Sequence, residues 1–235
     1  MDGVSIVVPT LGRSTLDRLL EVLNGQLPTA TQPVEIIVVR DESRRGPAAA
    51  RNQGWRAARY PWIAFLDDDV VPGPDWLALL GKDLSQPEQV GGVQGRLWVP
   101  LPAHRPPDDW EACTAGLARA RWTTADMAYR RAALLSVGGF DERFPRAYRE
   151  DAELAFRVSG QGWRLVRGER VCSHPVRPEG PWVSLRTQRG NADDALLRRL
   201  YGHRWRSLLG IPSGRRRRHA LVVASGVAAV ALGLA

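Results

Sequence analysis

The chain has few of the residues that staple a fold covalently or through a structural metal. Its 235 residues include two cysteines, Cys113 and Cys172. Two cysteines cannot form a disulfide framework, and the intervals between cysteines and histidines do not resemble a zinc site. Two buried thiols in a reducing compartment are therefore expected. Lysine is equally scarce, since Lys82 is the one lysine, and the net charge of +8 comes from arginine.

The first residues of the sequence do not show the pattern of a secretory signal peptide. Residues 1–3 are not followed by a basic stretch and a long apolar run, so a cytoplasmic location is expected. Near the other end, four arginines at 215–218 precede an uncharged segment at 220–235. As a helix that segment reaches about 24 Å, which is short of the roughly 30 Å hydrocarbon core.

The arginine run and the apolar segment together suggest a location at the cytoplasmic face of a membrane. Arginines at 215–218 suit anionic lipid headgroups on that side. Residues 220–235 would then dip into the bilayer or begin a longer transmembrane span. The alternative is a helix buried in the soluble domain.

Composition places the chain among globular proteins. Apolar residues make up 44% and charged residues 25%, which excludes wholesale disorder and a collagen-like structure. The length fits one domain or one domain with an appendage. The net positive charge suggests nucleic-acid binding as one hypothesis for the function. However, the chain carries no recognised nucleic-acid motif and its arginines are spread along it, so no nucleic-acid partner is expected.

Short apolar runs alternate with helical patterns in the first hundred residues. Expected strands cover 5–9, 34–39 and 62–66, and expected helices cover 15–27 and 48–59. This order predicts a parallel sheet with helices on both faces. In such sheets ligands bind beyond the carboxyl ends of the strands, where Thr10, Asp41 and Asp67 stand. The first half is therefore a candidate nucleotide-binding unit.

The second half is less regular. The pattern predicts a strand over 90–99, a short helix over 127–137, a helix over 150–160, a strand over 163–171 and a basic amphipathic helix over 182–201.

Three consecutive aspartates, Asp67, Asp68 and Asp69, directly follow the apolar strand at 62–66. Adjacent carboxylates repel one another and lose solvation, and a divalent cation relieves both costs. Strand alternation puts Asp67 and Asp69 on one side and Asp68 on the other. Asp67 and Asp69 are thus candidate ligands for one Mg²⁺ or Mn²⁺, with a solvated acidic turn as the alternative.

Several motifs, in one order and over about residues 3–200, resemble the family 2 glycosyltransferases of GT-A fold. They include Val7-Val8-Pro9-Thr10, Val38-Val39-Arg40-Asp41-Glu42-Ser43, Ala48-Ala49-Ala50-Arg51-Asn52, Phe65-Leu66-Asp67-Asp68-Asp69, Ala125-Asp126-Met127, Val137-Gly138-Gly139-Phe140-Asp141-Glu142 and Glu150-Asp151. The resemblance implies a Rossmann-like, mostly parallel sheet over residues 1–205. Its nucleotide-binding half would be about 1–100 and its acceptor half about 101–205, with a basic linker at 206–219 and the apolar segment at 220–235.

The resemblance also implies roles for individual residues. Asp67 and Asp69 would form the DxD motif that holds the metal, and Asp151 would be the catalytic base, with Glu150 as the next candidate. The residues implied for donor binding are Pro9, Thr10, Gly12, Arg13, Asp41, Arg51 and Asp68. On the acceptor side Asp126 matches a family motif, and Trp163 and Trp182 are candidate sugar-stacking residues. His174 follows a strand and could approach the metal or be a structural histidine.

The implied activity is metal-dependent, inverting transfer of a hexose-type sugar from a nucleotide-diphosphate sugar to a hydroxyl of a glycan, lipid-linked or small-molecule acceptor. The Gln-x-x-Arg-Trp motif of processive polymer synthases is missing, which favours single addition in glycan or cell-envelope biosynthesis. The alternative is a catalytically silent, membrane-associated nucleotide-sugar-binding protein of the same fold. The intact Asp67, Asp69 and Asp151 argue against it.

Overall fold

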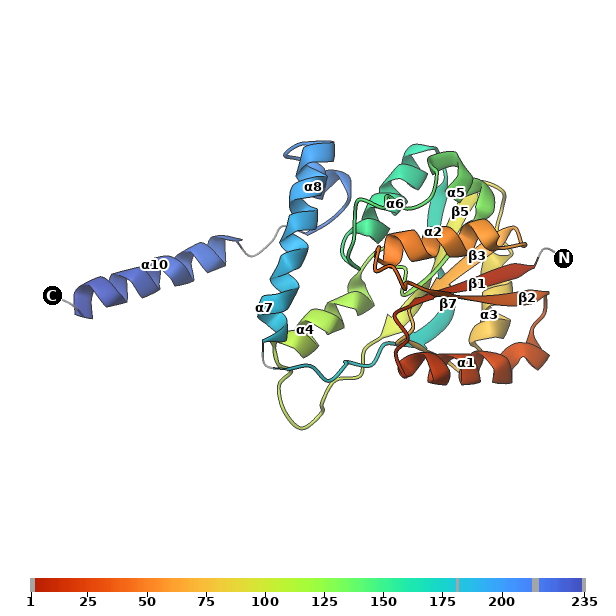
Figure 1. The fold of residues 1–235 in the computed structure, drawn as a ribbon, viewed down its shortest axis with the longest axis horizontal. Coiled ribbons are helices and arrows are strands. Elements are labelled where there is room, and N and C mark those ends of the chain that lie inside the picture. The colour runs from red at the N-terminus through yellow and green to blue at the C-terminus, as the bar shows by residue number, and fades with distance from the viewer. Residues whose placement is uncertain (1–2, 181, 213–215, 234–235) are drawn as a thin grey trace.

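The computed structural model describes residues 3–180, 182–212 and 216–233, the side chains of 216–219 excepted. Within these ranges seven strands form one sheet in the order β2-β1-β3-β6-β5-β7-β4 (Figure 1). The strands are β1 (Val4–Thr10), β2 (Val34–Arg40), β3 (Trp62–Leu66), β4 (Val71–Pro72), β5 (Val90–Trp98), β6 (Asp126–Arg130) and β7 (Arg164–Ser173).

Most strands of the sheet run in one direction. β1 is parallel to β2 and β3, and β5 is parallel to β7. β6 runs antiparallel to both β3 and β5, and the short β4 runs antiparallel to β7. The predicted mostly parallel, Rossmann-like sheet is confirmed. Because β6 is reversed, its first residue, Asp126, pairs with Leu66 at the end of β3.

The sequence prediction of a helix over 127–137 is wrong. Its first residues form the strand β6, and the helix α5 (Arg131–Val137) starts only after them. Met127 and Tyr129 are fully buried, and Met127 pairs with both Phe65 and Gln94. Pairing with two neighbouring strands outweighs local helix preference, and that pairing is not visible in a single short segment.

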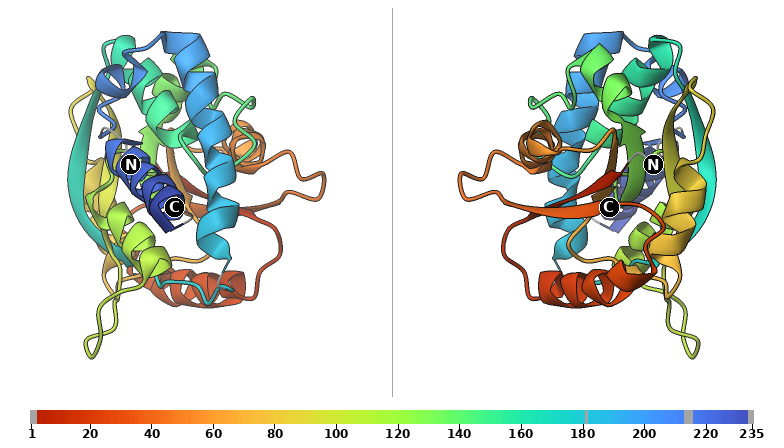
Figure 2. Two further views of the ribbon diagram at one scale, coloured as in Figure 1. Left: turned by 90° about the vertical axis from the view of Figure 1, so that its left-hand side faces the viewer. Right: turned by 90° about the vertical axis from the view of Figure 1, so that its right-hand side faces the viewer.

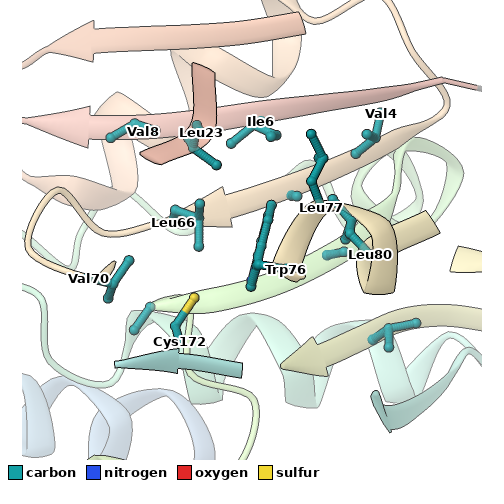
Figure 3. Packing of buried hydrophobic residues seen from close by; sticks show 14 of the residues in the cluster. Val4, Ile6, Val8, Leu23, Leu66, Val70, Trp76, Leu77, Leu80 and Cys172 are labelled. Carbon is teal, nitrogen blue, oxygen red and sulfur yellow. The ribbon is translucent and has the colours of Figure 1, made fainter. Parts of the chain in front are cut away.

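Helices cover both faces of the sheet (Figures 1 and 2). On one face, α1 (Thr15–Gln26) and α3 (Trp76–Leu84) contribute to a core with Val4, Ile6, Val8 and Leu66, several of which Figure 3 labels. On the other face, α2 (Pro47–Ala57), α5 and α6 (Glu150–Gly160) pack on Phe65 and Tyr129. Three shorter helical elements of the first half of the chain are η1 (Leu27–Thr29), α4 (Asp109–Ala115) and η2 (Gly116–Arg119).

The basic segment predicted as a helix over 182–201 is helical in three consecutive pieces. These are α7 (Val183–Thr187), the 3-10 turn η3 (Gln188–Gly190) and α8 (Asn191–Tyr201), followed by α9 (Trp205–Leu208). Gly190 lies against the Tyr148 ring, where an added Cβ would come within 2.9 Å of Tyr148 Cδ1. Leu197 and Trp205 pack with Phe144 into a third small core, so this segment belongs to the folded body.

The helix α10 (Arg216–Gly233) lies clear of the folded body (Figure 1). All its side chains from residue 220 to residue 233 are exposed, so the alternative of a tail buried in the domain is wrong. Among the described residues, the structure contains no helix with both the length and the apolar character needed to span a membrane. Parts of the arginine run and of the apolar segment lie outside the described residues, namely residue 215, the side chains of 216–218 and residues 234–235.

Candidate active site

Polar residues from five strands meet at one edge of the sheet. Thr10, Asp41 and Asp67 stand at or directly after the carboxyl ends of β1, β2 and β3, as the sequence predicts. β7 ends at Ser173 on the same edge, and the backbone N–H of His174 donates to the carbonyl of Trp98 at 2.8 Å. The edge therefore combines residues from the two halves of the chain.

Asp67, Asp69 and His174 form a candidate metal group. Each offers one ligand atom, and these atoms lie within 4.8 Å of one another. Nε2 of His174 is 3.6 Å from Oδ1 of Asp69, so the structure brings this histidine to Asp67 and Asp69. Burial raises the pKa of Asp69, and the charge of Asp67 adds to the rise, whereas His174 and Arg177 oppose it. Two carboxylates and one imidazole fit a divalent transition-metal ion, whereas Mg²⁺ prefers ligands that are all oxygen.

Asp68 points elsewhere, as strand alternation predicts. Its carboxylate accepts from Thr10 Oγ1 at 2.5 Å and from Arg13 at 2.7 Å, and its side chain is only 2% exposed. The Gly12 N–H in turn donates to Thr10 Oγ1 at 2.9 Å. Asp68 thus holds the loop after β1, and its predicted contact with the donor stays a prediction.

Asp41 organises the loop between β2 and α2. Its two carboxylate oxygens accept the backbone N–H groups of Arg45 at 2.9 Å and Gly46 at 2.7 Å. Its own N–H donates to the carbonyl of Thr10 at 2.9 Å, which ties this loop to the end of β1. Pro9 and Thr10 are buried, while Gly12 and Arg13 are exposed beside them.

Arg51 is the most enclosed charged residue of the site. It comes from α2, is 1% exposed, and donates to Asp67 Oδ1 at 2.7 Å and to Glu150 Oε1 at 2.8 Å. These two partners keep the pKa of its guanidinium raised despite burial. The predicted role of Arg51 in donor binding stays a prediction. Its guanidinium joins the candidate metal group to the start of α6.

Glu150 and Asp151 begin α6, directly after Arg149, whose backbone has a φ of 79°. Burial raises the pKa of Glu150 to about 8, and the neighbouring Asp151 charge adds to the rise. Burial also raises the pKa of Asp151 above its ordinary value. Tyr129 is buried below them, its hydroxyl has no partner within the described part of the chain, and burial and the Asp151 charge raise its pKa. This setting favours a carboxylate that accepts a proton readily.

The raised pKa of Glu150 predicts a pH effect on stability. Between pH 4.5 and 8 the folded chain holds a proton on Glu150 that the unfolded chain has lost. The free energy of unfolding therefore falls as pH rises through this window, by at most about 1.4 kcal/mol per pH unit. Urea unfolding at several pH values measures the slope of the free energy of unfolding against pH. This slope is expected to be shallower in Glu150→Gln than in the parent chain and in the exposed control Glu88→Gln. Equal slopes in all three would contradict the assignment.

The two residues predicted for the acceptor side are Asp126 and Trp163, and neither belongs to the candidate metal group. Asp126 is fully buried and accepts from Arg170 at 2.7 Å and from the Trp76 indole at 2.8 Å. Trp163 immediately precedes β7, at the opposite edge of the sheet, where its indole donates to Ser136 at 3.1 Å. The enclosed ion pair of Asp126 and the position of Trp163 at the opposite edge do not favour the predicted acceptor roles, which stay predictions. Trp182 is 71% exposed and lies just before α7.

Asp126 instead belongs to a buried charge cluster. Arg170, with no exposed area, pairs with Asp126 and also donates to Asp83 at 2.9 Å. Removing Asp126 leaves a buried guanidinium with half its compensation, so Asp126→Ala is expected to lower the free energy of unfolding by about 3 kcal/mol. Chemical denaturation measures this, with the exposed Asp109→Ala as control. A loss comparable to that of the control would contradict the structural role.

Arg177 lies beside Asp69 and was not predicted from the sequence to be near the site. Its Nε lies 3.3 Å from Asp69 Oδ2, on the side away from His174. The signal was available only after folding, because Arg177 follows β7 and Asp69 follows β3, with about half of the chain between them.

Comparisons with known proteins agree with this fold. The family model described as "Glycosyl transferase family 2" matches residues 17–144. A pre-mycofactocin glycosyltransferase of Mycobacterium tuberculosis is 31% identical over 191 residues, covering 69% of this chain. The chain spans 40% of the length of that relative. The chain belongs to glycosyl transferase family 2.

Solved structures show the same fold. A mannosyltransferase from Pyrobaculum calidifontis, in complex with GDP-mannose and Mn²⁺, superposes with a TM-score of 0.55 at 22% identity, over 82% of this chain and 64% of that one. Glucosyl-3-phosphoglycerate synthase from Mycobacterium tuberculosis, in complex with Mn²⁺ and UDP-glucose, has a TM-score of 0.55 at 16% identity, over 91% of this chain and 81% of that one. At these identities the likeness concerns the GT-A fold.

Proposed function

We propose that the chain is a glycosyltransferase that moves a sugar from a nucleotide-diphosphate sugar to an acceptor hydroxyl, one sugar at a time and with inversion at the anomeric carbon. The observation that supports the proposal is the continuous link from Asp67 through Arg51 to Glu150, which joins the candidate metal group to the residue that precedes Asp151. Donor-side and acceptor-side chemistry therefore meet at one edge of the sheet.

The residues of the site divide the work. Asp67, Asp69 and His174 would hold the divalent cation, which when bound neutralises charge on the leaving diphosphate. Asp151 accepts the proton of the acceptor hydroxyl as that oxygen attacks. Arg51 fixes Asp67 and Glu150 relative to each other, so the base stands at a set position. Gly12 and Arg13 are exposed at the end of β1 and offer contacts to the donor together with Asp41.

The donor class is supported by the structural relatives, which contain GDP-mannose or UDP-glucose with Mn²⁺. The direct test is a screen of the purified chain against UDP-, GDP- and dTDP-sugars, read by thermal shift with and without Mn²⁺. A nucleotide sugar that stabilises the chain only with Mn²⁺ supports the proposal. Release of the nucleoside diphosphate with an acceptor present separates an enzyme from a silent binding protein, which would bind donor and release nothing.

We also propose that α10 and the adjoining arginines bring the enzyme to an anionic, cytoplasmic membrane surface. Support comes from the exposed apolar side chains of α10, among them Leu221, Val222 and Leu232. A chain ending at residue 212 is expected to stop co-sedimenting with phosphatidylserine vesicles while keeping donor binding. Phosphatidylcholine vesicles serve as the uncharged control. Equal sedimentation of both chains would contradict a membrane role for this segment.

A further inference from the structure

A cavity of about 540 Å³ lies between α4 and the segment that leads into α7. Its volume falls within the range usual for small-ligand sites. Charged and aromatic side chains dominate its lining, namely Asp108, Asp109, Trp110, Glu111, Arg177 and Glu179. None of these residues belongs to the motifs of the sequence analysis.

The cavity adjoins the candidate metal group through a single residue. Arg177 lines the cavity, and its Nε lies 3.3 Å from Asp69 Oδ2. The indole N–H of Trp110 donates to the carbonyl of Arg177 at 3.0 Å, which fixes the Trp110 ring as part of the wall. A molecule in this cavity would therefore lie next to the end of the site that holds Asp69.

The charges of the lining select the kind of occupant. The one arginine of the lining, Arg177, already lies beside Asp69, so the lining offers no uncompensated cation and an anionic ligand is disfavoured. Glu111 is paired with Arg105, and Glu179 with Arg186, both at 2.7 Å. Asp109 is exposed and has no hydrogen-bond or ion-pair partner within the described ranges, so its oxygens are available to hydroxyl donors. A carboxylate acceptor and an indole in one lining suit a sugar ring, which offers hydroxyls at its rim and C–H groups on its face.

We propose that this cavity binds the acceptor, and that the acceptor part it binds is an uncharged sugar ring held by Asp109 and Trp110. Calling the ligand the acceptor rests on the proposed function, whereas binding of an uncharged sugar does not. The proposal gives the chain a glycan-type substrate and disfavours acceptors that present phosphate or carboxylate at this point.

Saturation-transfer NMR on the full chain tests the inference with two probes, methyl β-D-glucopyranoside and its carboxylate analogue methyl β-D-glucuronide. The neutral probe is expected to receive saturation and the anionic one to receive little. Trp110→Leu and Asp109→Asn are expected to raise the dissociation constant of the neutral probe about tenfold, equivalent to about 1.4 kcal/mol. Leu135→Ala changes an exposed apolar side chain of α5 outside the cavity lining, and as the control it is expected to leave binding unchanged.

The outcomes separate this inference from the proposed function. No saturation of the neutral glycoside, tighter binding of the glucuronide, or unchanged binding in both Asp109→Asn and Trp110→Leu would overturn it. Trp110→Phe keeps an aromatic face and guards against misfolding in the leucine variant, with far-UV circular dichroism as the check. Because neither probe contains a nucleotide or needs a metal, sugar binding without any donor binding would overturn the proposed function alone. Donor binding without sugar binding would overturn this inference alone.

Discussion

Replacing Asp151 by asparagine is expected to lower turnover by about 10²–10⁴, the usual range for the loss of a general base. The amide nearly preserves the shape of the side chain but cannot take the proton of an acceptor hydroxyl. Donor affinity is expected to stay within a few fold, because the candidate metal ligands come from β3 and β7 rather than from α6. Single-turnover rates and donor titration measure the two quantities separately.

Glu150 supplies the comparison for that experiment. It is 2% exposed and its Oε1 accepts from Arg51, so it is poorly placed to meet an acceptor. Glu150→Gln keeps a hydrogen-bond acceptor for Arg51 and is expected to retain far more activity than Asp151→Asn. If Asp151→Asn turned over normally and Glu150→Gln did not, the base would be Glu150.

Donor binding is expected to disappear when divalent cations are removed. Without a cation, Asp67 and Asp69 would repel the diphosphate of the donor, and the raised pKa of Asp69 already reflects its burial and the nearby Asp67 charge. EDTA is therefore expected to abolish donor binding measured by calorimetry, and added Mn²⁺ to restore it.

Variants locate this effect. Asp69→Ala is expected to lose donor binding even with saturating Mn²⁺, and His174→Ala to need more Mn²⁺ for the same binding. Glu88→Ala, a change of an exposed carboxylate in the loop before β5, is the control for altered net charge. Tight donor binding in EDTA would show that the chain does not use a metal for its donor.

Local sequence was enough to place the strand ends that form the site. β1, β2 and β3 lie within one or two residues of their predicted bounds, since continuous apolar β-branched and aromatic runs leave few alternatives. The same alternation separated Asp68 from Asp67 and Asp69. These features depend on neighbours along the chain, and so the sequence carries them directly.

The contacts of Asp126, Trp163 and Arg51 could not be predicted from the sequence, for one shared reason. Each matched a role through its position in the sequence, but its actual partners come from distant segments: Arg170 for Asp126, Ser136 for Trp163, and both Asp67 and Glu150 for Arg51. Burial converts a charged side chain from a ligand-binding group into an internal ion pair, because a buried charge must be compensated inside the protein.

By itself, the sequence determined the family, the direction of most of the sheet and the aspartates at its edge. The tertiary structure alone decided that His174 and Arg177 meet Asp69, that Arg51 links Asp67 to Glu150, and that the α4–α7 cavity adjoins this group. The physical reason is distance along the chain. Strand pairing aligns the end of β7 with the sheet edge that carries Asp67 and Asp69, and that pairing joins β5 and β7, segments about 75 residues apart.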